Sequence, residues 1–269
     1  MGKAVKFTKY SGAGNDFIMI NNYTKQYKEN WGGLARVLCP RALSAGADGV
    51  IVIQPSPDAD FEMLYFNADG STADMCGNGG RCVSMFAYRE GIAGKDMSFV
   101  TASGKYYSVI QGDQVRLKLV TAAASEGYTI MYKNVNVSGE YINTGVPHYV
   151  IKGLPKGEII SAGNFFRHHE TFAPQGTNVD WYEATGKNSI KIRTYERGVE
   201  NETLACGTGA VACALIAIQD EEVKSPVQVT TKSGIILTIE IDTSNGIVNE
   251  IYLIGDAREI YSAEIGRDV

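Results

Sequence analysis

Residues 75–87 read MCGNGGRCVSMFA, and residues 205–217 read ACGTGAVACALIA. When the second stretch is laid over the first, a Cys-Gly pair, a further glycine and an apolar helical face coincide at an offset of 130 positions. Each stretch follows a strand-like run and a loop, and each has the apolar spacing of a helix that begins at the cysteine. The sequence therefore repeats one supersecondary unit.

A second match supports an internal duplication. SGAGNDFIMI, which begins at Ser11, resembles TGVPHYVI, which begins at Thr144, at an offset of 133. Two matches in the same order and at nearly equal offsets predict two structurally similar halves. The boundary is expected near residues 120–125, where LKLVTAAASEG loses the alternation of a strand.

Strand-like runs outnumber helical ones, which predicts an α+β fold. Three helices are expected, over residues 30–41, 77–91 and 207–222, and a weaker helical pattern lies within residues 154–170. The first of these has apolar residues at positions 31, 34, 37 and 38, the spacing of one helix face.

The composition excludes several classes of function. A formal net charge of −5 over 269 residues gives no basic surface for nucleic acid or an anionic membrane. No apolar run approaches the ~20 residues that cross a bilayer. The first residues, MGKAVKFTKY, lack the apolar stretch of a signal peptide, so we expect a cytoplasmic location.

The five cysteines do not indicate a disulfide framework or a metal site. An odd number of cysteines in a cytosolic chain argues against structural disulfides. No C-x-x-C pair occurs and the chain has three histidines, so we expect no bound metal. Cys82 and Cys213 lie inside the apolar helical patterns, and they are expected, with Cys39, to be buried core thiols.

A cysteine at the start of a helix is suited to acid–base chemistry or to anion binding. The first amide N–H groups of a helix have no intrahelical partner and carry the positive end of the helix dipole. A thiol there is expected to have a pKa below about 8.5, and an anion can bind the same N–H groups. Neither motif has the full pattern of a nucleotide-binding loop.

Two such cysteines in equivalent places favour one reaction. If the halves face each other, two thiols can remove a proton from one face of a carbon and return one to the other face without a cofactor. One sulfur must then be thiolate and the other thiol, so the pair titrates as a unit. The simpler alternative is that Cys76 and Cys206 are small apolar residues that fill space at helix starts.

Five segments together resemble the diaminopimelate epimerase family. They are FTKYSGAGNDF, FNADGSTADMCGNGGRC, TGVPHYV, NVDWYE and RTYERGVENETLACGTGA, in the family's order and over essentially the whole chain. Proline racemases and phenazine-biosynthesis isomerases share the fold class, but racemases usually carry C-G-H-G at the first motif. Asn78 and the Glu196-Arg197-Gly198 triplet are similar to the epimerase pattern.

The resemblance implies an α+β fold of two pseudo-symmetric halves, each a strand barrel wrapped around a central helix, with the active site in the cleft between them. The C-terminal residues are expected to return to the first half. The N-terminal half would then comprise residues 1–120 plus 255–269, and the C-terminal half residues 121–254. The family also suggests a homodimer.

The implied activity is interconversion of LL- and meso-2,6-diaminopimelate, without pyridoxal phosphate or another cofactor, on the route to lysine and peptidoglycan. Cys76 and Cys206 would be the acid–base pair. Two alternatives stay open: a racemase or epimerase of another amino acid, such as proline or hydroxyproline, and an amino-acid-binding relative with idle thiols.

The resemblance also implies substrate contacts, and the chemistry of each residue suits its role. N–H groups at the two helix starts would bind the reacting α-carboxylate and stabilise the negative charge that develops there; these positions are Gly77, Asn78, Gly207 and Thr208. Arg197 can grip the distal carboxylate with two parallel hydrogen bonds. Asn67 and Asn178 would bind the same end of the substrate, and Asn15 would lie nearer its centre.

His148 and Glu196 match family positions that tune the cysteine pKa values, and Glu196 can also accept a hydrogen bond from a substrate amine. Taken alone, His148 could be a turn residue and Glu196 part of a surface ion pair. The sequence departs from the family at two positions associated with substrate contact: Val146 stands where Asn is common, and Gly49 where several members have Gln. These departures leave the substrate range open.

Overall fold

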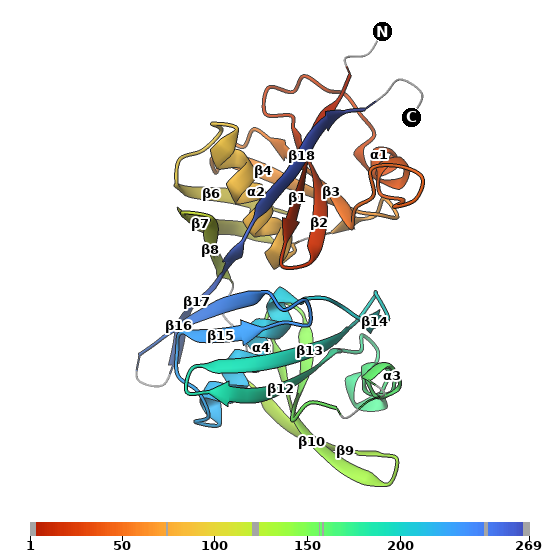
Figure 1. The fold of residues 1–269 in the computed structure, drawn as a ribbon, viewed down its shortest axis with the longest axis vertical. Helices are drawn as coiled ribbons and strands as arrows, with labels where there is room; N and C mark the ends of the chain where they lie inside the picture. Colours follow the sequence, from red (N-terminus) through yellow and green to blue (C-terminus); the bar gives the residue numbers. More distant parts are fainter. Residues whose placement is uncertain are drawn as a thin grey trace. The chain divides into compact units, whose positions relative to one another are not determined.

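The structure is a computed structural model that describes residues 4–73, 75–119, 124–155, 157, 159–244 and 247–265. The chain forms two compact units, Met1–Lys118 with Gly255–Val269, and Leu119–Ile254 (Figure 1). Residues 120–123 of the predicted boundary region lie outside the described residues.

The first unit is one curved sheet with two helices. Its elements are β1 (Lys6–Gly12), β2 (Asn15–Asn21), α1 (Trp31–Leu38), β3 (Gly49–Gln54), β4 (Phe61–Asn67), β5 (Thr72–Ala73), α2 (Gly77–Arg89), β6 (Asp96–Thr101), β7 (Gly104–Gln111), β8 (Gln114–Leu119) and β18 (Arg258–Glu264). The strand order is β18-β1-β2-β3-β4-β6-β7-β8. The pairs β2–β3 and β4–β6 are parallel, and the other pairs in this order are antiparallel.

The second unit repeats this topology. Its elements are β9 (Glu126–Tyr132), β10 (Val135–Asn143), β11 (Pro147–Lys152), α3 (Ile159–Arg167), the 3₁₀ turn η1 (Glu170–Phe172), β12 (Asn178–Gly186), β13 (Ser189–Glu196), β14 (Asn201–Glu202), α4 (Gly207–Gln219), β15 (Val227–Thr230), β16 (Ile236–Ser244) and β17 (Ile247–Asp256). The order is β9-β10-β11-β12-β13-β15-β16-β17, with β11–β12 and β13–β15 parallel.

The two orders match strand for strand, and β18 takes the place in the first unit that β9 has in the second. The C-terminal strand thus completes the N-terminal half by pairing with β1 (Figure 1). The α+β class and the two similar halves predicted from the sequence repeat are confirmed by this topology.

Each unit is built around one buried helix. Helix α2 packs against β1, β2, β3 and β7, and α4 packs against β10, β11, β12, β13, β15 and β16. Residues 77–87 of α2 are all buried, and so are residues 207–217 of α4 except Thr208. A helix that is buried on every side lacks a polar stripe, which is why its sequence reads as nearly continuous small and apolar residues.

Helices α1 and α3 have equivalent places as the crossovers between the parallel pairs β2–β3 and β11–β12. Helix α3 is shorter than the pattern at 154–170 suggested. The sequence patterns also missed β12 as a strand. Its residues 178–182 are all buried, although Asn178 and Asp180 are polar and alternate with apolar residues. Within the described residues no helix is long and apolar enough to cross a membrane.

Candidate active site

Cys76 and Cys206 hold the same local position, because each is the residue that caps the N-terminus of its central helix. Their backbones are extended, with φ of −135° and −122°, and the helices begin at the following glycines. The N–H of Gly209 donates to the Cys206 sulfur at 3.4 Å. The helix starts predicted from the repeat are therefore confirmed, and each cysteine directly precedes the first N–H groups of its helix, which have no intrahelical partner.

A chain of four polar groups leads from the sheet of the second unit to Cys206. Asp180 Oδ2 lies 2.6 Å from His148 Nδ1. The other ring nitrogen, Nε2, lies 3.0 Å from Thr208 Oγ1, which is 3.4 Å from the Cys206 sulfur. We call Asp180, His148, Thr208 and Cys206 the imidazole chain. Asp180 and His148 are fully buried, so water does not compete for these contacts.

Asn178 indicates the direction in which the hydrogen bonds of the imidazole chain run in this structure. Its Oδ1 accepts from the backbone N–H of Arg197 at 2.8 Å, which turns its Nδ2 toward His148 Nε2, 3.5 Å away. Because an amide nitrogen only donates, Nε2 is an acceptor and the ring proton is on Nδ1, facing Asp180. Thr208 then donates to Nε2 and accepts from the Cys206 thiol.

The thiol form of Cys206 agrees with its surroundings. Burial raises the pKa of Cys206 well above its ordinary value, and the nearby carboxylates of Glu196 and Asp180 raise it further, against the hydrogen bonds from Thr208 and Gly209. The sequence-based expectation of a lowered pKa at this helix start is therefore wrong for Cys206. The reason is that desolvation of a thiolate outweighs a few amide dipoles.

Asp180 is a residue that sequence reasoning missed. It also accepts a hydrogen bond from Thr194 Oγ1 at 2.6 Å. Its carboxylate packs so closely on the start of α4 that a Cβ at Gly209 would collide with Oδ1, which explains the second glycine of the motif. The available signal was a carboxylate between the apolar residues Val179 and Trp181 of the NVDWY segment, since a buried charge requires partners.

Of the candidate residues for the distal end of the substrate, Asn178, Glu196 and Arg197 belong to the second unit and Asn67 belongs to the first. Asn178 and Arg197 are joined by the backbone hydrogen bond already described. The Arg197 guanidinium donates to the Gln175 carbonyl at 3.4 Å. Glu196 ends β13, and its charge acts on Cys206. Asn67 belongs to the first unit, at the end of β4, where its amide donates to Ser71 Oγ at 3.1 Å.

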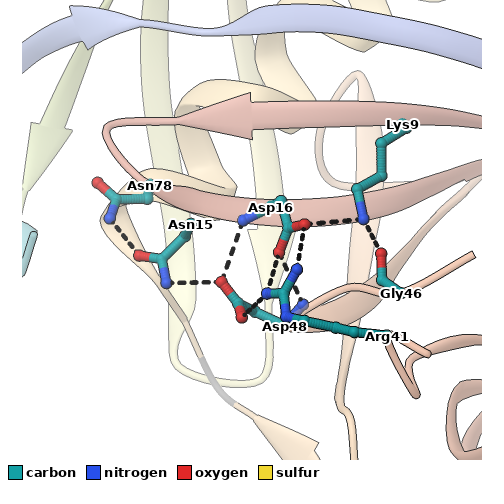
Figure 2. Close-up of polar contacts among 7 residues, drawn as sticks. All are labelled: Lys9, Asn15, Asp16, Arg41, Gly46, Asp48 and Asn78. Atoms are coloured by element: carbon teal, nitrogen blue, oxygen red, sulfur yellow. Dashed lines mark hydrogen bonds and ion pairs between the residues drawn. The ribbon is translucent and has the colours of Figure 1, made fainter. Parts of the chain in front are cut away.

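A second polar chain reaches the start of α2 in the first unit. Asn15 Nδ2 donates to Asp48 Oδ2 at 2.9 Å, and Asn78 Nδ2 donates to Asn15 Oδ1 at 2.5 Å (Figure 2). Arg81 in turn donates to Asn78 Oδ1 at 2.9 Å. We call Asp48, Asn15, Asn78 and Arg81 the amide chain. Of these four residues, Asp48 and Arg81 were not singled out from the sequence.

Arg81 is fully buried one turn into α2. Its guanidinium also donates to the Gly77 carbonyl at 3.2 Å and to the Asp256 carbonyl at 3.4 Å. Burial lowers the pKa of Arg81, and its interactions with Cys82, Cys76 and Asp256 oppose that effect. A buried positive charge thus lies close enough to Cys76 to interact with it.

The two departures from the family pattern have different surroundings. A Cβ at Gly49 would come within 2.5 Å of the Phe66 carbonyl oxygen and 2.6 Å of the Tyr65 ring, so the ring occupies the space that a side chain would need. Val146 lies in the loop before β11, where its carbonyl accepts from the Thr144 N–H at 3.2 Å. Thr144 Oγ1 in turn donates to the Thr208 carbonyl at 3.1 Å, so this loop borders the Cys206 helix start.

The remaining cysteines and histidines have structural settings. Cys39, Cys82 and Cys213 are buried thiols, as predicted. His169 accepts from the Thr171 N–H at the start of η1, and His168 contacts the Asn164 carbonyl. Among the residues that the structure describes, no group of three or more His, Cys, Asp or Glu side chains could hold a metal ion.

The chain is similar to known proteins of one family. The family model described as diaminopimelate epimerase matches residues 7–125 and 140–260. A diaminopimelate epimerase of Aquifex aeolicus is 38% identical over 98% of this chain and 99% of its own length. That of Chlorobaculum tepidum is 39% identical over 95% of this chain and 99% of its own length.

Solved structures with the same fold are much less similar in sequence. A phenazine biosynthesis protein of the PhzF family from Bacillus anthracis matches with a TM-score of 0.71 at 14% identity, over 98% of this chain and 99% of its own. A hydroxyproline epimerase from Agrobacterium vitis matches with a TM-score of 0.70 at 15% identity, over 99% and 93%. The resemblance found in the sequence motifs is confirmed by the family match and the relatives: the chain belongs to the diaminopimelate epimerase family.

Proposed function

We propose that this protein interconverts LL- and meso-2,6-diaminopimelate by transferring protons at one α-carbon, with Cys76 and Cys206 as the two proton-transferring groups. The observation that carries the proposal is that both cysteines cap the central helix of their unit, in two units of the same topology. Membership of the epimerase family supports the substrate.

The chemistry needs no redox change and no group carrier. A thiolate on one cysteine takes the α-proton and becomes a thiol, and the electron pair of the broken C–H bond stays on the substrate. The thiol of the other cysteine gives its proton to the opposite face of that carbon and becomes the thiolate. Each turnover therefore exchanges the protonation states of the two sulfurs, and the reaction requires both to reach the same carbon.

The main energetic problem is the negative charge on the carbon and its carboxylate after the proton leaves. The helix starts at Gly77-Asn78 and Gly207-Thr208 offer backbone N–H groups and the positive ends of two helix dipoles. Donors that are already in place stabilise such charge without reorganisation, and removing one costs about 10²–10³ in rate in other enzymes.

The unreacting end of the substrate is a second amino acid. Arg197 is proposed to bind its carboxylate, helped by Asn178, which holds the Arg197 backbone, and by Asn67. Glu196 is proposed to accept a hydrogen bond from a substrate amine. Asn15 and Asn78 are proposed to contact the substrate nearer its reacting centre.

His148 is proposed to set the proton state of Cys206 through Thr208. In the arrangement described above, the thiol donates to Thr208 and Thr208 donates to Nε2. If the two hydroxyl hydrogen bonds reverse, a proton moves from sulfur to the ring, which leaves a thiolate and an imidazolium beside Asp180. The same four groups can therefore support both proton states that the reaction needs.

The test is proton exchange in D₂O. The protein is incubated with LL-diaminopimelate, and NMR follows loss of the α-proton signal and formation of the meso isomer. We expect both in the wild-type protein, and no meso product from the folded Cys76→Ala variant. A well-folded wild-type protein that exchanges no α-proton would contradict the proposal. Proline and hydroxyproline serve as comparison substrates, because Arg197 should demand a second carboxylate.

The homodimer and the cytoplasmic location expected from the sequence stay predictions. Gel filtration with light scattering on the purified protein tests the first. The role in lysine and peptidoglycan synthesis follows from the proposed substrate and is tested by whether the gene restores growth to a strain that lacks this epimerase.

A further inference from the structure

We infer that Asp48 and Arg81 are positioning residues that hold the side-chain amides of Asn15 and Asn78 in one orientation at the start of α2. The inference rests on the proposed function, in which Asn15 and Asn78 contact the substrate. It adds two residues, one at each end of the amide chain, that touch no substrate themselves.

The orientation follows from the chemistry of the two ends. An ionised carboxylate only accepts hydrogen bonds, and a guanidinium only donates them. Asp48 accepts from Asn15 Nδ2, and Arg81 donates to Asn78 Oδ1. Between these ends, one orientation of each amide lets every contact pair a donor with an acceptor. Turning Asn15 over would bring its oxygen against the Asp48 carboxylate and its nitrogen against the nitrogen of Asn78.

Both ends are themselves fixed. Arg81 is fully buried and holds two backbone carbonyls, those of Gly77 and Asp256. Asp48 accepts from the backbone N–H of Asp16 at 3.1 Å, and its own N–H donates to Asp16 Oδ1 at 3.1 Å. The end groups therefore cannot turn to accommodate a reversed amide.

An ion cluster of Arg41, Asp16 and Lys9 adjoins Asp48. Arg41 donates to both oxygens of Asp16, at 2.8 and 2.7 Å, and to Asp48 at 2.7 Å (Figure 2). Lys9, which is buried, pairs with Asp16 at 2.8 Å and donates to the Gly46 carbonyl. Burial would raise the pKa of Asp16, but its bonds to Arg41 and Lys9 outweigh burial and lower the pKa to about 2.

The amide chain fixes the direction of the hydrogen-bond donors that Asn15 and Asn78 offer at the site. Each amide nitrogen carries two hydrogens, and the amide chain uses one hydrogen of Asn15 and one of Asn78. The second hydrogen of each amide then points in a fixed direction. Donors that are oriented before the substrate arrives bind it without the cost of ordering two rotatable side chains.

The experiment compares two neutral variants of the same branched shape, Asp48→Leu and Asp48→Asn. Only the asparagine keeps an acceptor oxygen for Asn15. We expect Asp48→Leu to raise KM for diaminopimelate about tenfold with a smaller change in kcat, and Asp48→Asn to keep most of the wild-type KM. Hydrogen bonds that involve charged groups are worth about this much. A purely structural role of the ion cluster would instead lower the thermal stability of both variants equally and leave KM unchanged.

The matched control is Asp60→Leu. The Asp60 carboxylate also accepts a backbone hydrogen bond, from the Ser98 N–H at 2.8 Å, but it lies outside the amide chain. We expect this variant to keep the wild-type KM. If its KM rises as much as that of Asp48→Leu, the inference is overturned.

A second readout does not depend on activity. The side-chain amide signals of protein labelled with ¹⁵N-asparagine, assigned with Asn15→Asp and Asn78→Asp, should shift for both residues in Asp48→Leu and stay near wild type in Asp48→Asn. Unchanged signals in folded Asp48→Leu would overturn the orientation, and shifted signals with an unchanged KM would overturn its role in binding. If the wild-type protein is inactive on diaminopimelate, the proposed function fails while the amide signals still decide the orientation.

Discussion

The starts of α2 and α4 share one backbone arrangement but differ in the groups that surround it. In both, a cysteine caps the helix, and the second residue of the helix contacts a residue near the start of a strand: Asn78 contacts Asn15, and Thr208 contacts His148. In both, the side chain of that strand residue also hydrogen-bonds to an aspartate, Asp48 or Asp180. The amide chain and the imidazole chain are therefore two versions of one pattern.

The two chains differ in the residue at which each one ends and in whether a central side chain can accept a proton. The amide chain ends on the Arg81 guanidinium, and none of its central groups changes charge near neutral pH. The imidazole chain ends on the Cys206 sulfur and contains a histidine, whose ring nitrogen can accept a proton. Val211 stands in α4 where Arg81 stands in α2. The duplicated fold thus supplies a fixed, positively charged setting for Cys76 and an adjustable, negatively charged setting for Cys206.

The largest expected effect tests what the halves share. If both thiols transfer protons, Cys206→Ala and Cys76→Ala should each lower kcat/KM for diaminopimelate by about 10²–10⁴-fold, because a positioned acid or base contributes about that much and each variant blocks one of the two transfers. The control is Cys213→Ala, which removes a buried thiol from the middle of α4 and should keep the activity. Substantial epimerisation by Cys206→Ala would contradict the two-thiol mechanism.

The next effect tests what separates the halves. His148→Asn gives the imidazole chain the amide that Asn15 has in the other unit, and it can keep the bond to Asp180. The chain then has no group that accepts a proton from Cys206. We expect kcat to fall about 10²-fold with little change in KM. His168→Asn, at an exposed histidine, should have no effect. Near-normal kcat in His148→Asn would mean that the two settings are interchangeable.

The sequence predicted the part of this comparison that is local along the chain. A cysteine followed by glycines and an apolar run identifies a helix start, and its recurrence at 205–217 identifies the second half. The burial of Cys39, Cys82 and Cys213 followed from their positions in helical patterns. The candidate residues came from short motifs in the family's order, and each motif can be recognised because it is contiguous in the sequence.

The aspartates that hydrogen-bond to these residues could not be predicted in the same way. Asp48 meets Asn15, and Asp180 meets His148, across the parallel pairs β2–β3 and β11–β12, whose strands are joined by long helical crossovers. Strand register decides which residues meet, and the apolar patterns did not fix it. The raised pKa of Cys206 was missed for a related reason, since desolvation depends on the whole unit packed around the thiol.

The different settings should also appear in thiol reactivity. Cys206 is 7% exposed and its pKa is raised by burial, whereas Cys76 is only partly buried. A higher pKa leaves less thiolate at a given pH, and the thiolate is the form that reacts. At pH 8, iodoacetamide should label Cys76 at least about tenfold faster than Cys206, as measured by mass spectrometry of the two peptides. Equal labelling rates in the ligand-free protein would show that the two settings do not differ as described.

The smallest effect concerns stability at high pH. Burial raises the pKa of Cys206 and of Cys213 in the folded state, while in the unfolded chain both titrate near about 8.5. Above that pH the unfolded chain has lost these protons and the folded chain still binds them. The stabilisation is therefore complete below pH 8.5 and is lost as the pH rises, by about 1.4 kcal/mol per pH unit for each thiol.

Cys213→Ala removes one of these two thiols from α4 without touching the imidazole chain. Urea unfolding in the presence of a reductant, between pH 9 and about 10.5, should therefore give a free energy of unfolding that falls less steeply in the variant, by about 1.4 kcal/mol per pH unit. The variant should also be less stable at pH 7, because it leaves a small cavity in a fully buried helix. The change in slope separates titration from that packing loss, since a cavity lowers stability equally at every pH. Parallel curves for the two proteins would mean that Cys213 titrates in the folded chain as it does in the unfolded one.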